Sequence, residues 1–112
     1  MGIIKKALRR SSHSNRRIVK SALQEAMELA HILVKKFGAR AVVLYGSLAQ
    51  GRYFDETSDV DLAVKGMGDN YFKAYGYCIR LSKFDIDVRV YDDMPRSMKS
   101  RIDKEGRLLY GR

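Results

Sequence analysis

A short loop that joins two strand-like segments constrains this chain most, because it combines a glycine–serine step with two closely spaced aspartates. Residues 41–45 are apolar throughout, as in an interior strand covered on both faces, and they end at Gly46-Ser47. Residues 60–64 form the second predicted strand, whose entrance carries Asp59 and Asp61. Residues i and i+2 of a strand share one face, about 6.5–7 Å apart, so both carboxylates are predicted to project together.

This loop has the chemistry of a site for a metal-bound nucleotide. Two neighbouring carboxylates repel each other unless a cation lies between them, and hard oxygen ligands of this kind suit Mg²⁺. Gly46 lets the backbone turn sharply and approach a ligand closely. If a helix begins at Ser47, its free N–H groups and its dipole favour an anion such as a phosphate.

The spacing of these residues resembles the signature of the polymerase-β-type nucleotidyltransferases, and the size of the chain resembles their smallest branch, the minimal nucleotidyltransferases. The resemblance rests on Gly46-Ser47-x-Ala49-x-Gly51 followed by Ser58-Asp59-x-Asp61-Leu62. It implies an α/β (α+β) fold, with a small mixed β-sheet of about four strands flanked by helices. The sequence departs from the family at Gln50, where Arg or Lys is usual, and the loop before Asp59 is one residue longer than usual.

The resemblance also implies the roles of individual residues. Asp59 and Asp61 are expected to hold two Mg²⁺ ions, and a third carboxylate is expected from a later strand. Residues 84–91 alternate apolar and polar side chains, and Asp87 fits the third position, with Asp85 as the alternative. The phosphates of ATP are expected at three residues: Gly46, Ser47 and Arg52, the last as a substitute for the basic residue missing at position 50.

The length of the chain predicts one domain, which the resemblance implies is a nucleotidyltransferase domain over residues 16–112, preceded by a basic N-terminal arm over residues 1–15. Helices are predicted from Arg16 to Phe37, from about residue 70 to Ser82, and between Pro95 and Gly106; a short edge strand follows at Leu108–Tyr110. In the second of these helices the predicted buried side consists of Phe72, Tyr75 and Ile79. The aromatic residues at this spacing are interpreted as core or interface rather than as a platform for bases.

Charge and composition restrict the function only weakly. The chain has 22 Lys and Arg against 13 Asp and Glu, a net charge of +9, which is compatible with RNA, nucleotides or acidic proteins. The basic residues are spread along most of the chain, so an RNA partner is not favoured. No apolar run approaches the ~20 residues that cross a bilayer, and neither a signal peptide nor a second cysteine to pair with Cys78 is recognised. A cytoplasmic protein without a membrane partner is therefore expected.

The acceptor is expected to be another macromolecule, because the nucleotidyltransferase core accounts for nearly the whole chain. The signature and the Gly106–Tyr110 ending resemble the antitoxin partners of HEPN-domain ribonuclease toxins. That resemblance implies transfer of AMP from ATP to a tyrosine of the toxin. Two alternatives stay open: an antitoxin that neutralises its toxin by binding alone, and an RNA-binding or RNA-modifying nucleotidyltransferase. The edge strand also leaves a homo-oligomer open.

Overall fold

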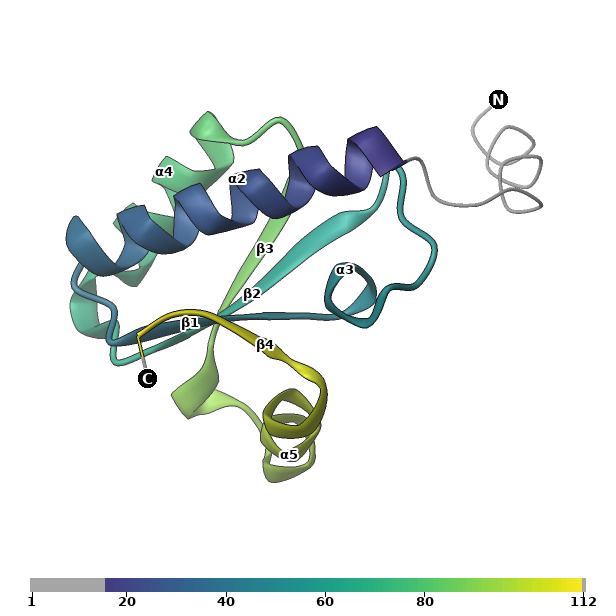
Figure 1. Cartoon of the computed structure of the whole chain (residues 1–112). Helices are drawn as coiled ribbons and strands as arrows, with labels where there is room; N and C mark the ends of the chain where they lie inside the picture. Colours follow the sequence, from purple (N-terminus) through teal and green to yellow (C-terminus); the bar gives the residue numbers. More distant parts are fainter. Residues whose placement is uncertain (1–15, 112) are drawn as a thin grey trace.

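A four-stranded mixed β-sheet is the frame of the computed structural model, which describes residues 16–111 (Figure 1). The strand order is β3-β2-β1-β4, where β1 spans Ala41–Tyr45, β2 Asp59–Lys65, β3 Asp85–Val90 and β4 Arg107–Gly111. β1 pairs antiparallel with β2 and β4, whereas β2 and β3 are parallel. The predicted fold class is confirmed. The predicted basic arm, residues 1–15, lies outside the described residues.

Helices lie on both faces of this sheet. α2 (Arg16–Lys35) and α4 (Tyr71–Leu81) lie on one side, and α5 (Arg96–Glu105) lies on the other, as Figure 1 shows. The short α3 (Ser47–Gln50) directly follows β1, and two 3-10 turns, η1 (Gly68–Asn70) and η2 (Tyr91–Asp93), precede α4 and α5. Within residues 16–111, no helix has the length and apolarity needed to cross a membrane.

The two faces of the sheet bury very different amounts of apolar surface. The face toward α2 and α4 holds the main core, in which alternate residues of β1, β2 and β3 pack against Leu29, Leu33, Ala74 and Cys78. The opposite face has a smaller cluster, made of Val43, Ala63, Met94 and Ile102, under α5. β1 is apolar throughout because its residues alternate between these two clusters. Beside the smaller cluster, the face toward α5 carries polar side chains.

Two tyrosines of α4 close the exposed edge of β3. The Tyr71 hydroxyl donates a hydrogen bond to the carbonyl of Val88, and the Tyr75 hydroxyl donates one to the carbonyl of Ile86 at 3.4 Å. The carbonyls on the outer side of an edge strand have no neighbouring strand to bond, so these contacts satisfy them and hold α4 on the strand. Both tyrosines therefore have structural roles here, as the interpretation of the sequence expected.

The buried side of α4 differs from the prediction. Phe72 is 82% exposed and Ile79 is 56% exposed, and only Tyr75 of the predicted three is partly covered. Ala74 and Cys78 face the core instead. Small side chains let a helix lie close to a sheet, whereas the apolar periodicity of the sequence gives the same weight to either stripe. The prediction of Phe72 and Ile79 as core residues is wrong.

The loop before β2 is organised by Asp55, whose side chain is only 3% exposed. Its Oδ1 accepts hydrogen bonds from the Thr57 backbone N–H at 2.9 Å and from the hydroxyls of Thr57 and Ser58. Its Oδ2 accepts one from the Tyr53 hydroxyl at 3.2 Å. Burial alone would raise the pKa of Asp55, but the bonds from Thr57, Tyr53 and Ser58 outweigh it and hold the pKa below its usual value. This turn delivers the chain to Asp59.

We expect Asp55→Asn to lower the free energy of unfolding by about 1–3 kcal/mol at pH 7, because an amide cannot accept all of these bonds. The difference should shrink as the pH falls through the lowered pKa of Asp55, since a depressed carboxyl pKa stabilises the fold only while the group is ionised. Urea unfolding at pH 7 and at acid pH measures both. The exposed Asp69→Asn is the control. Equal losses for the two variants would contradict this account of the loop.

Candidate active site

The pairing of β2 with β3 brings the aspartates of two distant segments to one face of the sheet. Asp61 lies opposite Asp87, and Asp59 lies opposite Asp85. Parallel neighbours are about 4.8 Å apart, and residues in register point to the same face. On the other side of β2, Tyr45 of β1 lies opposite Asp61. A row of Tyr45, Asp61 and Asp87 therefore crosses three strands on the face that α5 covers only in part.

Asp61 is the most perturbed acid of this row. Its pKa is raised to about 6, first by burial and then by the negative charges of Asp87 and Asp59, and Arg89 offsets only part of this. Asp85 is exposed and is not among the groups that raise the pKa of Asp61. The electrostatic partners of Asp61 are thus Asp59 and Asp87. Of the two aspartates of β3, Asp87 is thus the one whose charge acts on Asp61, and its role as the third carboxylate stays a prediction.

Gly46 gives Asp61 the space that it occupies. Its backbone angles, φ 78° and ψ −156°, lie in a region that only glycine adopts readily. A Cβ on Gly46 would lie 2.3 Å from Oδ2 of Asp61. The close approach that the structure shows at this glycine is one between the end of β1 and the Asp61 carboxylate, whereas the expected approach to a ligand stays a prediction. The contact with Asp61 fixes the distance between the signature loop and the paired aspartates.

Asp87 already has a cationic neighbour. The Arg89 side chain donates a hydrogen bond from Nε to Oδ2 of Asp87 at 3.0 Å, two residues along the same face of β3. The negative charge of Asp87 is the largest cause of the raised pKa of Arg89. Arg89 thus neutralises part of the negative charge of Asp59, Asp61 and Asp87, which are together called the carboxylate row below.

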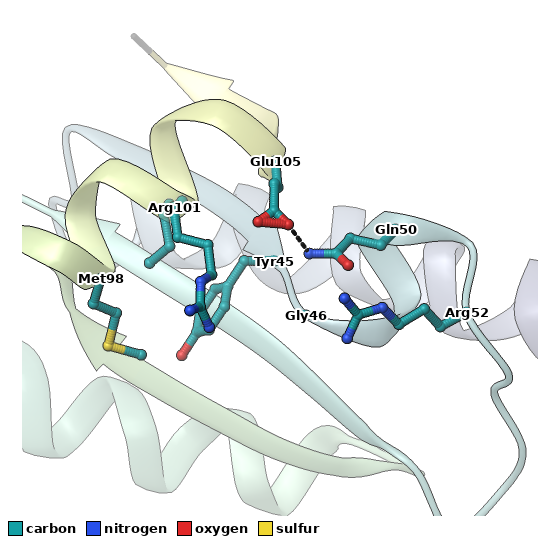
Figure 2. Close-up of a pocket in the computed structure, with 8 residues that line it drawn as sticks. Tyr45, Gly46, Gln50, Arg52, Met98, Arg101 and Glu105 are labelled. Atoms are coloured by element: carbon teal, nitrogen blue, oxygen red, sulfur yellow. Dashed lines mark hydrogen bonds between the residues drawn. The ribbon is translucent and has the colours of Figure 1, made fainter.

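A cavity of about 480 Å³ opens beside Gly46, between the loop and α5. It is lined by Tyr45, Gly46, Gln50, Arg52, Met98, Arg101, Ile102 and Glu105. Figure 2 shows the Arg52 and Arg101 side chains extending toward the space between α3 and α5. Gln50 donates a hydrogen bond from Nε2 to Glu105 at 2.6 Å and so joins the two helices. The cavity offers two guanidinium groups next to the carboxylate row.

The structure brings most of the predicted site residues together. Gly46 and Arg52 line the cavity, and Asp59, Asp61 and Asp87 share the neighbouring face of the sheet. Ser47 begins α3 directly after Gly46, outside the residues that line the cavity. Two residues were not predicted: Arg101 of α5 and Arg89 of β3. The alternation of residues 84–91 placed Arg89 on the face of Asp87, whereas no spacing in the sequence connects Arg101 to the loop.

The carboxylates of Asp59, Asp61 and Asp87 suit a hard divalent cation, but they would have to move to surround one. Asp61 with a pKa near 6 is a carboxylate that a cation would stabilise, and Asp59 and Asp87 add further oxygen ligands. Among residues 16–111, no three acidic, histidine or cysteine side chains form a ready-made metal cluster, and Asp87 is paired with Arg89. Binding a cation at all three aspartates therefore requires the Asp87 carboxylate to reorient or to share its oxygens with Arg89.

We expect Gly46→Ala to destabilise the fold by several kcal/mol, because it adds backbone strain of about 1–3 kcal/mol and a collision with Asp61. Gly68→Ala is the matched control: Gly68 also has a positive φ, of 65°, but nothing lies within 4 Å of its would-be Cβ. The control should lose only the cost of the left-handed backbone. Thermal unfolding measures both, and equal losses would show that the contact with Asp61 is unimportant.

We expect Asp61→Asn to stabilise the metal-free protein above pH 6, on the order of 1–2 kcal/mol once solvent screening is allowed for. A raised carboxyl pKa gives stability that is present below the unfolded value of 3.8 and is lost as the pH rises through about 6, so the amide removes this loss. The gain in Tm should vanish near pH 4 and be absent in Asp85→Asn. Mn²⁺ should raise the Tm of Asp61→Asn less than it raises the Tm of the unchanged protein. A gain that is independent of pH would contradict the raised pKa of Asp61.

Comparisons with known proteins agree with this fold. The family model described as "Polymerase beta, Nucleotidyltransferase" matches residues 27–112. A comparison with curated proteins gives no match.

Three solved structures resemble the fold, each at a low identity that supports the fold alone. A toxin–antitoxin crystal structure with AMP-PNP is 20% identical, with a TM-score of 0.61, over 80% of this chain and 73% of that chain. The toxin–antitoxin MntA-HpeT, carrying two aspartate-to-glutamate changes, is 18% identical at the same TM-score and coverage. A putative nucleotidyltransferase from Sulfolobus solfataricus is 22% identical, with a TM-score of 0.53, over 86% of both chains. Because this family model matches most of its length, the chain belongs to the polymerase β nucleotidyltransferase family.

Proposed function

We propose that this protein is an antitoxin that transfers AMP from ATP to a tyrosine of a partner HEPN-domain ribonuclease toxin, with Mg²⁺ as cofactor. The observation that carries the proposal is the row of Asp59, Asp61 and Asp87 beside a cavity that contains Arg52 and Arg101. Family membership supports nucleotidyl transfer in general. The likeness of the fold to two toxin–antitoxin structures, one of them with the ATP analogue AMP-PNP, supports the nucleotide and the class of partner.

The cavity has the charge that a triphosphate needs. Arg52 and Arg101 present cations from two different elements, and a guanidinium group can donate two parallel hydrogen bonds to phosphate oxygens. Gly46, which has no side chain, lets phosphate oxygens approach the backbone N–H groups at the start of α3. Arg52 would thus replace the basic residue that the family usually has at the position of Gln50, since Gln50 is bonded to Glu105.

In the proposed reaction, the phenolic oxygen of the acceptor tyrosine attacks the α-phosphorus of ATP. The bond between this phosphorus and the oxygen that bridges to the β-phosphate breaks, and that oxygen leaves with the electron pair as part of pyrophosphate. Asp87 lies at the end of the carboxylate row and can accept the phenolic proton, with its carboxylate either reoriented away from Arg89 or shared with it. Asp59, Asp61 and Asp87 would hold the Mg²⁺ ions, which supply charge stabilisation to the attacking and leaving oxygens when bound.

The proposed modification would act on the toxin through size and charge. Tyrosine adenylylation replaces a neutral hydroxyl by a phosphodiester with one negative charge and an attached nucleoside. An anionic group in an RNA-binding cleft repels the phosphates of the substrate. Silencing would therefore need no lasting complex between the two proteins. A binding-only antitoxin needs such a complex and needs no carboxylates.

The test uses intact-mass spectrometry of the purified HEPN-domain toxin after incubation with this protein, ATP and Mg²⁺. We expect the toxin to gain the mass of one or more AMP units, and the Asp59→Ala/Asp61→Ala double variant to give no gain. Asp87→Asn should slow the transfer by at least about 100-fold, within the range that proton transfer and charge stabilisation supply together. Asp85→Asn, at the exposed end of β3, should keep most of the rate.

The outcomes separate the three readings. A stable complex without any mass gain would overturn the enzymatic proposal for this partner and favour the binding-only antitoxin. AMP units on RNA rather than on the toxin would favour an RNA-modifying enzyme. If Asp85→Asn abolished transfer while Asp87→Asn did not, the third carboxylate would be Asp85.

A further inference from the structure

We infer that the acceptor protein docks on the outer face of α4, through apolar and acidic side chains of its own, and reaches Asp87 through a neighbouring hollow. This inference rests on the proposed function, because it assumes that the acceptor is a protein. It concerns a surface that the proposed reaction does not use. The surface consists of Phe72, Lys73, Gly76, Ile79 and Arg80, and is called the α4 face below.

The α4 face exposes large apolar side chains on one continuous side of a helix. Phe72 and Ile79 are seven residues apart, two turns of an α-helix, so they lie nearly above each other with Gly76 between them. Their exposed fractions are 82% and 56%. They lie on the side of α4 away from Ala74 and Cys78, the residues that face the core. Neither side chain contributes to the main core, so the fold itself does not explain their apolar character.

A cation is set into this apolar surface. A Cβ on Gly76 would lie 3.4 Å from Nη1 of Arg80, so the guanidinium group rests against the part of the helix that the glycine leaves bare. The exposed Lys73 lies seven residues before Arg80 and continues the same basic stripe. The α4 face thus combines an apolar stripe with a basic one. A partner segment that complements it presents apolar side chains next to a carboxylate.

The α4 face leads toward the catalytic carboxylates. The ring of Phe72 meets the ring of Tyr71 edge-on, with centroids 5.3 Å apart. Tyr71 in turn lines a hollow of about 330 Å³, together with Arg89, Met94 and Met98. Arg89 is bonded to Asp87, and Met98 also lines the cavity beside Gly46. The hollow therefore lies between Phe72 at the edge of the α4 face and Arg89 beside Asp87, and it offers an acceptor side chain a route from one to the other.

The charges of the chain argue for a protein of opposite charge over the other occupants. A second copy docked face to face would bring Arg80 and Lys73 against their own equivalents, and the chain as a whole carries +9. RNA would satisfy the two cations and could stack a base on Phe72, but it would leave the aliphatic Ile79 against polar surface. An acidic protein segment with apolar side chains matches all of these groups.

Binding of the purified HEPN-domain toxin to the full chain, measured by isothermal titration calorimetry, tests this inference. We expect Phe72→Ser, Ile79→Ser and Arg80→Glu each to weaken binding by about 10-fold or more, as buried anchors of an interface do. The matched controls are Leu108→Ser, an apolar side chain that is 55% exposed on β4, and Lys104→Glu, an exposed cation of α5. Both controls should bind like the unchanged chain, and because all five side chains are exposed, none of these changes should unfold it.

A kinetic readout separates docking from catalysis. The α4-face variants should raise the KM for the toxin while leaving kcat and the affinity for ATP unchanged. Binding that is weakened by these variants without any AMP transfer would keep the docking surface and overturn the proposed function. Transfer that is unaffected by all three variants would overturn the docking surface and keep the function. If the three variants weakened self-association and left toxin binding unchanged, the docking inference would be overturned in favour of a second copy of the chain. If they weakened RNA binding instead, it would be overturned in favour of RNA.

Discussion

Repulsion between carboxylates is the constraint on which the rest of this structure depends. Asp61 faces Asp87 across two parallel strands and has Asp59 two residues away on the same face. Such an arrangement costs free energy in the absence of a cation, and this repulsion adds to the larger effect of burial in raising the pKa of Asp61. The arrangement persists because the backbone pairing of β2 and β3 and the core beneath them fix the positions of these residues. The fold thereby concentrates negative charge at one point of its surface, where positive charge would be stabilising.

Several neighbouring features position these aspartates or neutralise part of their charge. Gly46 has no side chain where the Asp61 carboxylate lies, Asp55 holds the turn that leads to Asp59, and Arg89 neutralises part of the charge of Asp87. The opposite face of the sheet is filled by α2 and α4, so only the face toward α5 is open to ligands. The second cluster under α5 is small, and the cavity with Arg52 and Arg101 lies beside it. Incomplete coverage of one face is thus what gives the site access to substrates.

An apolar residue can be buried in an interface with a partner as well as in the core. Phe72 and Ile79 fit a helical apolar stripe, so periodicity assigned them to the interior, yet Ala74 and Cys78 occupy that place. The hydrophobic effect acts on any apolar surface removed from water, and it does not distinguish a core from an interface. Only the position of α4 on β3, fixed partly by Tyr71 and Tyr75, decides which stripe turns inward.

Short-range patterns in the sequence were enough to predict the strands, the loop between them and the resemblance to the family. The apolar run 41–45, the step at Gly46 and the spacing of Asp59 and Asp61 are all local. Alternation placed Asp85 and Asp87 on one face, but it could not choose between them. The register of β2 with β3 placed Asp87 opposite Asp61 and Asp85 opposite Asp59, and the docking of α5 brought Arg101 to a loop more than forty residues away in the sequence. Register and helix docking arise from packing across the whole sheet, which no local pattern encodes.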